Sequence, residues 1–162
     1  MEWVKTTMEQ KEEQQLEWLQ QHQTKEPQLG LERVRRLLSL RGNPHLLVSV
    51  IHVAGTNGKG STIAHLRQLL QVKKLRVGTF TSPSLLCYNE QIAINGVPIS
   101  DEDFHSLLQT YQQVIENHST DQLLQAITEF EIITALAYDY FFQNQVDVGI
   151  MEVGLGGLLD ST

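Results

Sequence analysis

The stretch that decides the fold is VSVIHVAGTNGKGS, residues 48–61. Its first six residues are mostly apolar and β-branched, which predicts a buried strand. The glycines that follow allow backbone N–H groups to converge on one point, and Lys59 adds a positive charge there. A helix that begins directly after the loop would add the dipole of its N-terminus. These are the parts of a nucleotide phosphate site. The alternative is a glycine-rich turn between a strand and a helix, with an incidental surface lysine.

The loop departs from the general phosphate-loop pattern G-x-x-x-x-G-K-S/T. Counting back from Gly58 and Lys59, the first glycine position holds Val53, and Gly60 stands where the hydroxyl residue should be. The same components recur in shifted positions, since Ser61 brings a hydroxyl to the start of the expected helix. A generic P-loop NTPase is disfavoured by the inserted Gly60 and by the motifs described below.

Working outward from this loop, the hydrophobic spacing predicts alternating helices and strands. Helices are expected over about 8–23, 31–41, 60–73, 101–117 and 128–144, and strands near 48–53, 75–80 and 146–151. Asn95-Gly96 predicts a hairpin turn, and Ser100 predicts a helix N-cap. The order indicates an α/β fold with a P-loop-type, mostly parallel sheet flanked by helices. The Glu- and Gln-rich stretch 8–23 could instead be a disordered leader.

Composition narrows the functional classes. The chain has 162 residues, 41% of them hydrophobic, and a net charge of −7, which argues against a general nucleic-acid binder. It has no apolar stretch of membrane-spanning length and no signal-peptide segment, so we expect neither a membrane nor a secretory location. Cys87 is the single cysteine, which excludes an intramolecular disulfide and favours the cytoplasm.

Further polar residues are expected at the carboxyl ends of the strands, where ligands of parallel sheets gather. Ser82 follows the second strand, and Glu152 follows the third. ATP chemistry needs Mg²⁺, which prefers hard oxygen ligands, so Glu152 could hold the ion or its water. The alternative is a surface acid at a strand end. Three glycines within 154–157 favour close approach to a ligand.

Other charged residues have simpler explanations. Glu129 and Glu131 fall in the first turn of a helix, where acids favour the helix dipole. The arginines of the 31–41 helix, Arg33, Arg35, Arg36 and Arg41, are expected on a solvated face and receive no catalytic role. The six histidines show no zinc-ligand spacing, and no serine-hydrolase elbow G-x-S-x-G is present.

Taken together, these segments resemble the N-terminal part of the folylpolyglutamate synthases, also called dihydrofolate synthases, of the Mur ligase family. The resemblance covers nearly the whole chain from about residue 29, and the order and spacing of its motifs are more specific than any one of them. The motifs are LGLERV (29–34), HVAGTNGKGS (52–61), TSP (81–83), NEQIAING (89–96), TEFE (128–131) and EVGLGG (152–157).

The resemblance implies an ATP-dependent ligase of folate biosynthesis and polyglutamylation, which adds L-glutamate to dihydropteroate or a folate through an acyl phosphate. It implies ATP and Mg²⁺ as cofactors, small molecules as partners, and a monomer in the full-length family. It also implies a helical leader over 1–28 and part of an ATP-binding domain over 29–162.

The resemblance also assigns residues to sites. The ATP phosphates would lie on Thr56, Asn57, Gly58, Lys59, Gly60 and Ser61, with Lys59 stabilising the charge that develops during transfer. Ser82 and Glu152 match the family's Mg²⁺ ligands. The segments that match contacts to the pterin-bearing substrate are Thr128, Glu129, Phe130 and Glu131, with Leu159, Asp160 and Ser161.

The departures from the family pattern raise a second hypothesis. Ser84 stands where a histidine is common, Leu158 stands where an arginine is common, and family members are more than twice as long. The chain could therefore be a fragment of a ligase or an inactive remnant that at most binds nucleotide. With the rest of the sheet missing, the strand near 146–151 is expected to expose an unpaired apolar edge.

Overall fold

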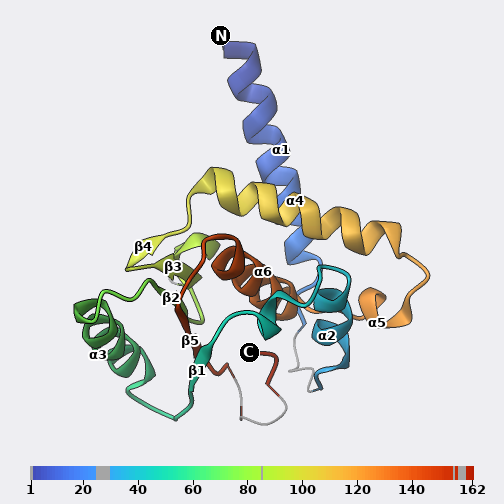
Figure 1. Ribbon diagram of the computed structural model, residues 1–162. Coiled ribbons are helices and arrows are strands. Elements are labelled where there is room, and N and C mark those ends of the chain that lie inside the picture. The colour runs from blue at the N-terminus through green and yellow to red at the C-terminus, as the bar shows by residue number, and fades with distance from the viewer. Residues whose placement is uncertain (1, 25–29, 85, 155, 157–159) are drawn as a thin grey trace.

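The fold is built on a five-stranded sheet with the order β1-β5-β2-β3-β4 (Figure 1). The computed structural model describes residues 2–24, 30–84, 86–154, 156 and 160–162, with side chains from residue 9 onward. Strands β1 (Val50–Val53), β5 (Val148–Glu152) and β2 (Val77–Phe80) are parallel, whereas β3 (Ile92–Ile94) and β4 (Val97–Pro98) form an antiparallel hairpin. The predicted α/β fold class is confirmed.

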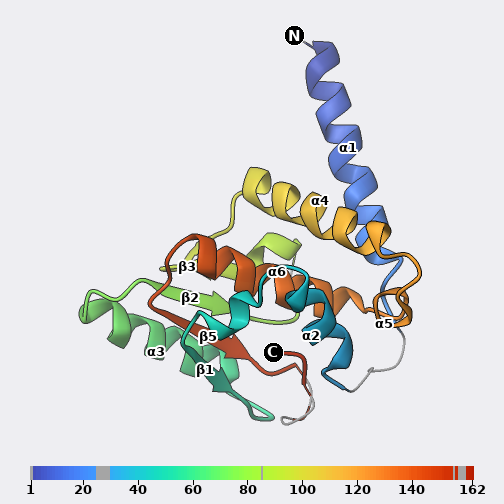
Figure 2. The same ribbon diagram turned by 45° about the vertical axis from the view of Figure 1, so that its right-hand side comes forward.

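Helices cover both faces of this sheet (Figures 1 and 2). Helix α3 (Lys59–Val72) lies on one face, and α6 (Glu129–Gln143) lies on the other, flanked by α2 (Glu32–Ser39) and crossed by α4 (Asp101–Asn117). Helix α1 (Glu2–Gln20) contacts α4 near its C-terminal end and projects away from the body. No described helix combines the length and apolarity needed to cross a membrane.

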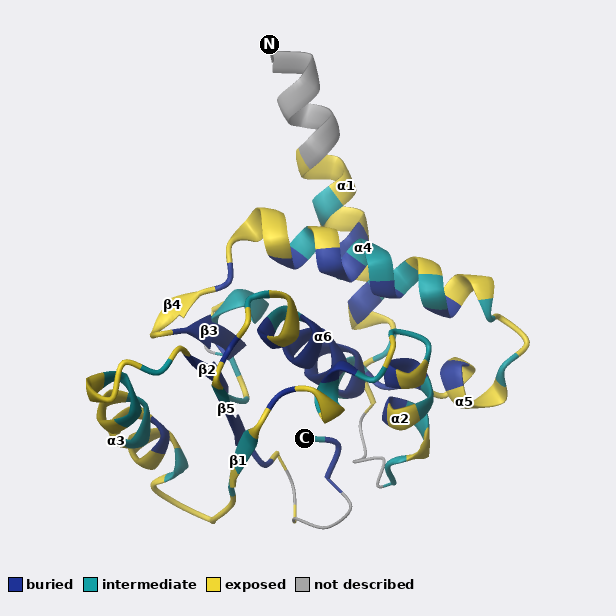
Figure 3. Ribbon diagram, viewed as in Figure 1, coloured by how far each residue is buried: buried dark blue, intermediate teal, exposed yellow. Residues whose placement is uncertain are grey.

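The hydrophobic core lies between the sheet and α6 (Figure 3). Phe141 of α6 is fully buried, and its ring lies over two paired glycines, Gly78 of β2 and Gly149 of β5. A Cβ atom at Gly78 would stand 2.8 Å from that ring. The two glycines therefore allow α6 to approach the sheet closely enough for an aromatic ring to fill the space between them.

Local signals in the sequence set several element boundaries as expected. Asn95 and Gly96 adopt positive φ values of 53° and 84° in the two-residue turn between β3 and β4. The Ser100 side chain accepts a hydrogen bond from the Asp103 N–H and caps α4. The structure confirms the helical interpretation of the Glu- and Gln-rich stretch. Three short helices were not predicted: Pro44–Leu46, Tyr88–Gln91 and α5 (Gln122–Gln125).

The expected unpaired edge at residues 146–151 is wrong. Strand β5 is an interior strand of the sheet, pairing with β1 on one side and β2 on the other. The crossover through α3 leaves a gap between β1 and β2 that β5 fills, and Ile150 and Met151 are fully buried there. Strand β1, whose His52 is exposed, forms the outer edge instead.

Candidate functional site

The glycine loop joins the carboxyl end of β1 to the first turn of α3. Gly55 and Gly58 adopt φ values of 155° and 77°, which other residues rarely accept, and Gly58 is the N-cap of α3. Residues 55–58 are exposed. The N-terminal end of α3 therefore presents an accessible turn with open backbone geometry, which suits an anion.

Two charged side chains meet beside this loop. The register of β1 against β5 sets Val53 opposite Glu152, and the Lys59 Nζ atom lies 3.6 Å from the Glu152 Oε1 atom. Lys59 also donates a hydrogen bond of 3.0 Å to the carbonyl oxygen of Gly55. Glu152 is 8% exposed, so its carboxylate faces the loop from within the sheet. This geometry brings together the lysine and the carboxylate that the sequence analysis selected.

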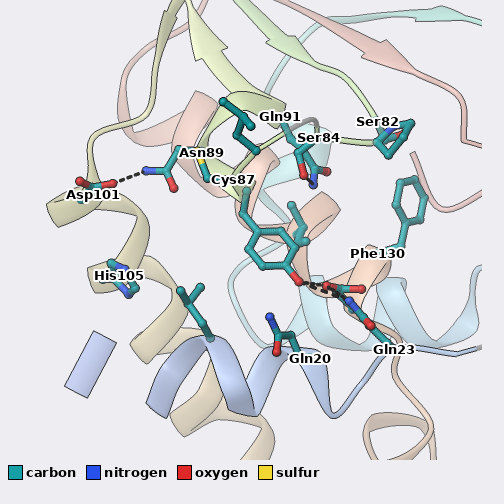
Figure 4. Close-up of a pocket in the computed structure, with 16 residues that line it drawn as sticks. Gln20, Gln23, Ser82, Ser84, Cys87, Asn89, Gln91, Asp101, His105 and Phe130 are labelled. Atoms are coloured by element: carbon teal, nitrogen blue, oxygen red, sulfur yellow. Dashed lines mark hydrogen bonds between the residues drawn. The ribbon is translucent and has the colours of Figure 1, made fainter. Parts of the chain in front are cut away.

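A cleft of about 600 Å³ lies along the loop after β2, the end of α1 and the start of α6 (Figure 4). Its described lining carries two carboxylates and several amide and hydroxyl groups, but no lysine or arginine. The residues that line it are Leu16, Gln20, Gln23, Ser82, Pro83, Ser84, Leu86, Cys87, Tyr88, Asn89, Gln91, Asp101, His105, Glu129, Phe130 and Ile133. Of the predicted site residues, Ser82, Glu129 and Phe130 reach this cleft.

Three polar side chains from distant segments meet in the cleft, and dashed lines mark their hydrogen bonds beside Gln23 in Figure 4. The Tyr88 hydroxyl donates a hydrogen bond to the Glu129 Oε1 atom, and the Gln23 Nε2 atom donates to the same oxygen at 3.0 Å. Burial, followed by this hydrogen bond to Glu129, raises the pKa of Tyr88 to about 12. The phenol therefore stays protonated and holds the Glu129 carboxylate in one orientation. Tyr88 and Gln23 were not predicted, because no local pattern marks them.

The Phe130 ring, which lines the cleft, also lies against the segment that follows β5. A Cβ atom at Gly154 would stand 2.9 Å from the Phe130 ring and 3.4 Å from the Asp160 Oδ2 atom. Asp160 and Ser161 are both 8% exposed. The structure thus brings Phe130 and Asp160 together around Gly154. Two residues named in the sequence analysis lie outside the described residues: Leu159, a predicted site residue, and Leu158, which stands where an arginine is common.

Thr128 and Glu131 turn away from the cleft. The Glu131 side chain is 1% exposed, and its carboxylate accepts hydrogen bonds from the Thr128 N–H at 2.9 Å and the Thr128 hydroxyl at 3.0 Å. Its partner is Arg33, whose side chain is 13% exposed. The expectation of a solvated arginine face is therefore wrong for Arg33, because a carboxylate 98 positions later in the chain draws it inward.

The two predicted Mg²⁺ ligands, Ser82 and Glu152, offer oxygen donors. No described group of three or more histidine, cysteine, aspartate or glutamate residues could hold a metal ion. Glu152 supplies one carboxylate and Ser82 one hydroxyl. A carboxylate and a hydroxyl are oxygen donors of the kind that suits Mg²⁺, which keeps several waters and binds through one or two protein ligands plus phosphate oxygens.

Comparisons with known proteins identify proteins of similar sequence and fold. No family model matches the chain. The dihydrofolate synthase/folylpolyglutamate synthase of Bacillus subtilis is 46% identical over 134 residues, which is 82% of this chain and 31% of that protein. The chain therefore spans about a third of the length of the curated relatives that it matches.

Solved structures show the same fold. The folylpolyglutamate synthase of Mycobacterium tuberculosis, complexed with ADP, superimposes with a TM-score of 0.84 at 33% identity, covering 94% of this chain and 34% of that one. A folylpolyglutamate synthase bound to AMPPCP and folate superimposes with a TM-score of 0.77 at 37% identity, covering 93% of this chain and 37% of that one. The chain is homologous, over most of its own length, to part of the dihydrofolate and folylpolyglutamate synthases.

Proposed function

We propose that this homologue of the folylpolyglutamate synthases is the nucleotide- and pterin-binding part of an ATP-dependent ligase that adds L-glutamate to dihydropteroate or a folate. The observation that carries the proposal is the meeting of Lys59 and Glu152 beside the exposed loop 55–58, at the carboxyl ends of adjacent parallel strands. A lysine, a carboxylate and a helix N-terminus at one edge of a parallel sheet suit the triphosphate of ATP.

In this proposal residues 56–61 bind the ATP phosphates. Backbone N–H groups at the start of α3 face the phosphate oxygens, and the Lys59 ammonium stabilises charge on the transferring phosphoryl group. Two solved structures similar to this chain, one complexed with ADP and one with AMPPCP and folate, support nucleotide binding.

Mg²⁺ would be held by Ser82 and Glu152 together with phosphate oxygens. When bound, the ion would neutralise part of the negative charge of the phosphates. Glu152 also contributes a negative charge beside Lys59: its carboxylate lies 3.6 Å from the ammonium and holds it beside the loop. The contribution of Ser82 is a hydroxyl at the border between the loop after β2 and the cleft.

The cleft would take the ring end of the substrate. Phe130 offers an aromatic face, and Glu129 offers a carboxylate that accepts hydrogen bonds, held in place by Tyr88 and Gln23. A pterin is planar and rich in N–H donors, so it matches both features. Since the described lining has no lysine or arginine, the carboxylate end of the substrate would be disfavoured there.

The reaction would proceed in two steps. An oxygen of the substrate carboxylate attacks the γ-phosphorus of ATP, and the bond to ADP breaks, giving an acyl phosphate. The amine of L-glutamate then attacks the acyl carbon and loses a proton. The tetrahedral intermediate releases inorganic phosphate, which leaves an amide. Lys59 would act in the first step, whereas Glu129 and Phe130 would position the substrate throughout.

A second candidate is a nucleotide-binding protein without ligase activity. It is favoured by the exposed loop 55–58 at the start of α3, which suits a nucleotide phosphate in a ligase and in a simple nucleotide-binding protein alike. We expect the isolated chain to bind ATP weakly and to form no product. ADP release that depends on ATP, Mg²⁺, L-glutamate and either dihydropteroate or a folate would contradict this expectation. ATP hydrolysis that does not depend on folate or glutamate would instead indicate a different class of NTPase.

The cytoplasmic location, the monomeric state of a full-length protein and the division at residue 28 stay predictions.

The direct test of the phosphate site is the variant Lys59→Met, with Lys73→Met at the other end of α3 as the matched control. Loss of a charge-assisted contact of about 1.5–3 kcal/mol weakens ATP binding by about tenfold or more. Isothermal titration of the chain with ATP and Mg²⁺ measures the effect. Lys73 is exposed and distant from the loop, so its variant should bind like the wild type. Equal affinities for all three proteins would contradict the site.

A further inference from the structure

Two ion pairs join the segment containing α2 to α6. Arg33 pairs with Glu131 near the start of α6, and Arg41 pairs with Asp139 eight residues later in both segments. Each pair spans 98 positions of sequence. The two segments therefore run side by side in the same direction, clamped at both ends, and α2 forms extensive contact with α6.

The pair at the start of α6 is the more deeply buried. The Arg33 Nε atom donates to both oxygens of Glu131, at 3.1 and 3.0 Å, and the two side chains are 13% and 1% exposed. Glu131 also forms the capping box of α6 with Thr128: its carboxylate accepts a hydrogen bond from the Thr128 N–H, and its own N–H donates to the Thr128 hydroxyl. One carboxylate thus ties together the helix N-terminus and an arginine from a different helix.

The residues held by this junction are the ones that reach the cleft. Glu129 and Phe130 lie between Thr128 and Glu131 in the chain, and both line the cleft. The Glu129 N–H donates a hydrogen bond to the His22 carbonyl at 3.0 Å, so the end of α1 depends on the same turn. A shift of this turn would move the carboxylate and the aromatic ring together.

We propose that Arg33 is a positioning residue for the cleft: through Glu131 it sets where Glu129 and Phe130 stand, without touching a ligand itself. This inference rests on the proposed function, in which the cleft takes the pterin-bearing substrate. It differs from a general stabilising role, because the matched pair Arg41–Asp139 joins the same two segments away from the cleft.

The test compares Arg33→Met with Arg41→Met in the full chain. Removing one partner leaves a buried carboxylate without its cation in both variants, so both lose stability. We expect Arg33→Met to weaken dihydropteroate binding by about tenfold or more while ATP binding changes by less than about twofold. Arg41→Met should leave both affinities within about twofold of the wild type. Arg33→Lys should restore part of the affinity, because it returns the charge but not the two-oxygen contact.

If Arg33→Met does not fold, the double variant Arg33→Met/Glu131→Gln removes both charges and keeps the comparison. A folded Arg33 variant with wild-type dihydropteroate affinity, or equal losses in the Arg33 and Arg41 variants, would overturn the proposal. Failure of the wild-type chain to bind dihydropteroate would count against the proposed function instead. In that case amide hydrogen exchange decides: faster exchange over 128–131 in Arg33→Met, but not in Arg41→Met, supports positioning, and equal exchange overturns it.

Discussion

At the residue scale, the environment of Glu152 differs from that of an ordinary acid at a strand end. It is the last residue of the interior strand β5, is 8% exposed, and lies 3.6 Å from the Lys59 ammonium. Burying a carboxylate costs free energy unless a charge or hydrogen bond compensates, and here the lysine supplies that compensation. The same pairing would keep Lys59 beside the loop before nucleotide binds.

The variant Glu152→Gln tests its proposed part in Mg²⁺ binding. The amide keeps the shape of the side chain but removes its negative charge. In the wild type we expect Mg²⁺ to raise the affinity for ATP, and in Glu152→Gln we expect this increase to be about tenfold smaller. Titrations with ATP in the presence and absence of Mg²⁺ measure this increase. Asp147→Asn, just before the amino end of β5, is the control and should keep the Mg²⁺ dependence. An unchanged dependence in Glu152→Gln would remove this residue from the metal site.

At the element scale, the position of α6 depends on two strands having glycine at paired positions. Gly78 and Gly149 leave the space that the ring of Phe141 fills. Because α6 also carries Glu129 and Phe130 at its start, the packing at Phe141 and the ion pair at Glu131 fix the same helix at different points. The cleft wall therefore depends on the packing of a whole helix against the sheet.

The variant Gly78→Ala tests this packing. Its Cβ atom would stand 2.8 Å from the Phe141 ring, so we expect the free energy of unfolding to fall by about 1–3 kcal/mol. Urea denaturation followed by circular dichroism measures the change. In Gly60→Ala nothing lies within 4 Å of the added Cβ atom. Because position 60 is helical, alanine should raise the free energy of unfolding there by up to about 1 kcal/mol relative to glycine. A larger loss at position 60 than at position 78 would contradict this explanation.

At the scale of the whole molecule, the four tyrosines share one property. Burial is the first cause of a raised pKa in each, with about 12 for Tyr88 and Tyr138, a value well above 10 for Tyr111, and an upward shift for Tyr140. Nearby carboxylates add to the shift, as Asp160 does at Tyr138 and Asp139 does at Tyr111. The folded protein therefore protects its phenols from ionising.

This property predicts loss of stability in alkali. In the unfolded chain tyrosine ionises near pH 10, so below that pH the folded and unfolded states bind the same phenolic protons. Above it the unfolded chain loses protons that the folded chain keeps, and the free energy of unfolding falls between about pH 10 and 12, by at most about 1.4 kcal/mol per pH unit for each tyrosine. Tyrosinate absorbance measured with and without denaturant gives the two titrations. A folded-state midpoint near pH 10 would contradict the prediction, and Tyr138→Phe should make the alkaline loss less steep.

The sequence by itself determined the longer helices, the parallel strands and the glycine loop after β1, because their signals are local. Glycines beside Lys59, the Asn95-Gly96 turn and the Ser100 cap each act over a few residues, and an apolar strand followed by Glu152 marks a strand end. The motif order also identified the relatives. These features depend on backbone geometry and hydrophobic spacing that neighbouring residues impose on one another.

Only the tertiary structure decided which residues meet across long stretches of chain. It placed β5 between β1 and β2, drew Arg33 into a buried pair with Glu131, and brought Gln23, Tyr88 and Glu129 together at the cleft. It also separated Glu129, which faces the cleft, from Glu131, which supports the helix from inside. The physical reason is that strand order and buried charge pairing follow from the packing of the whole chain, and no local pattern carries that information.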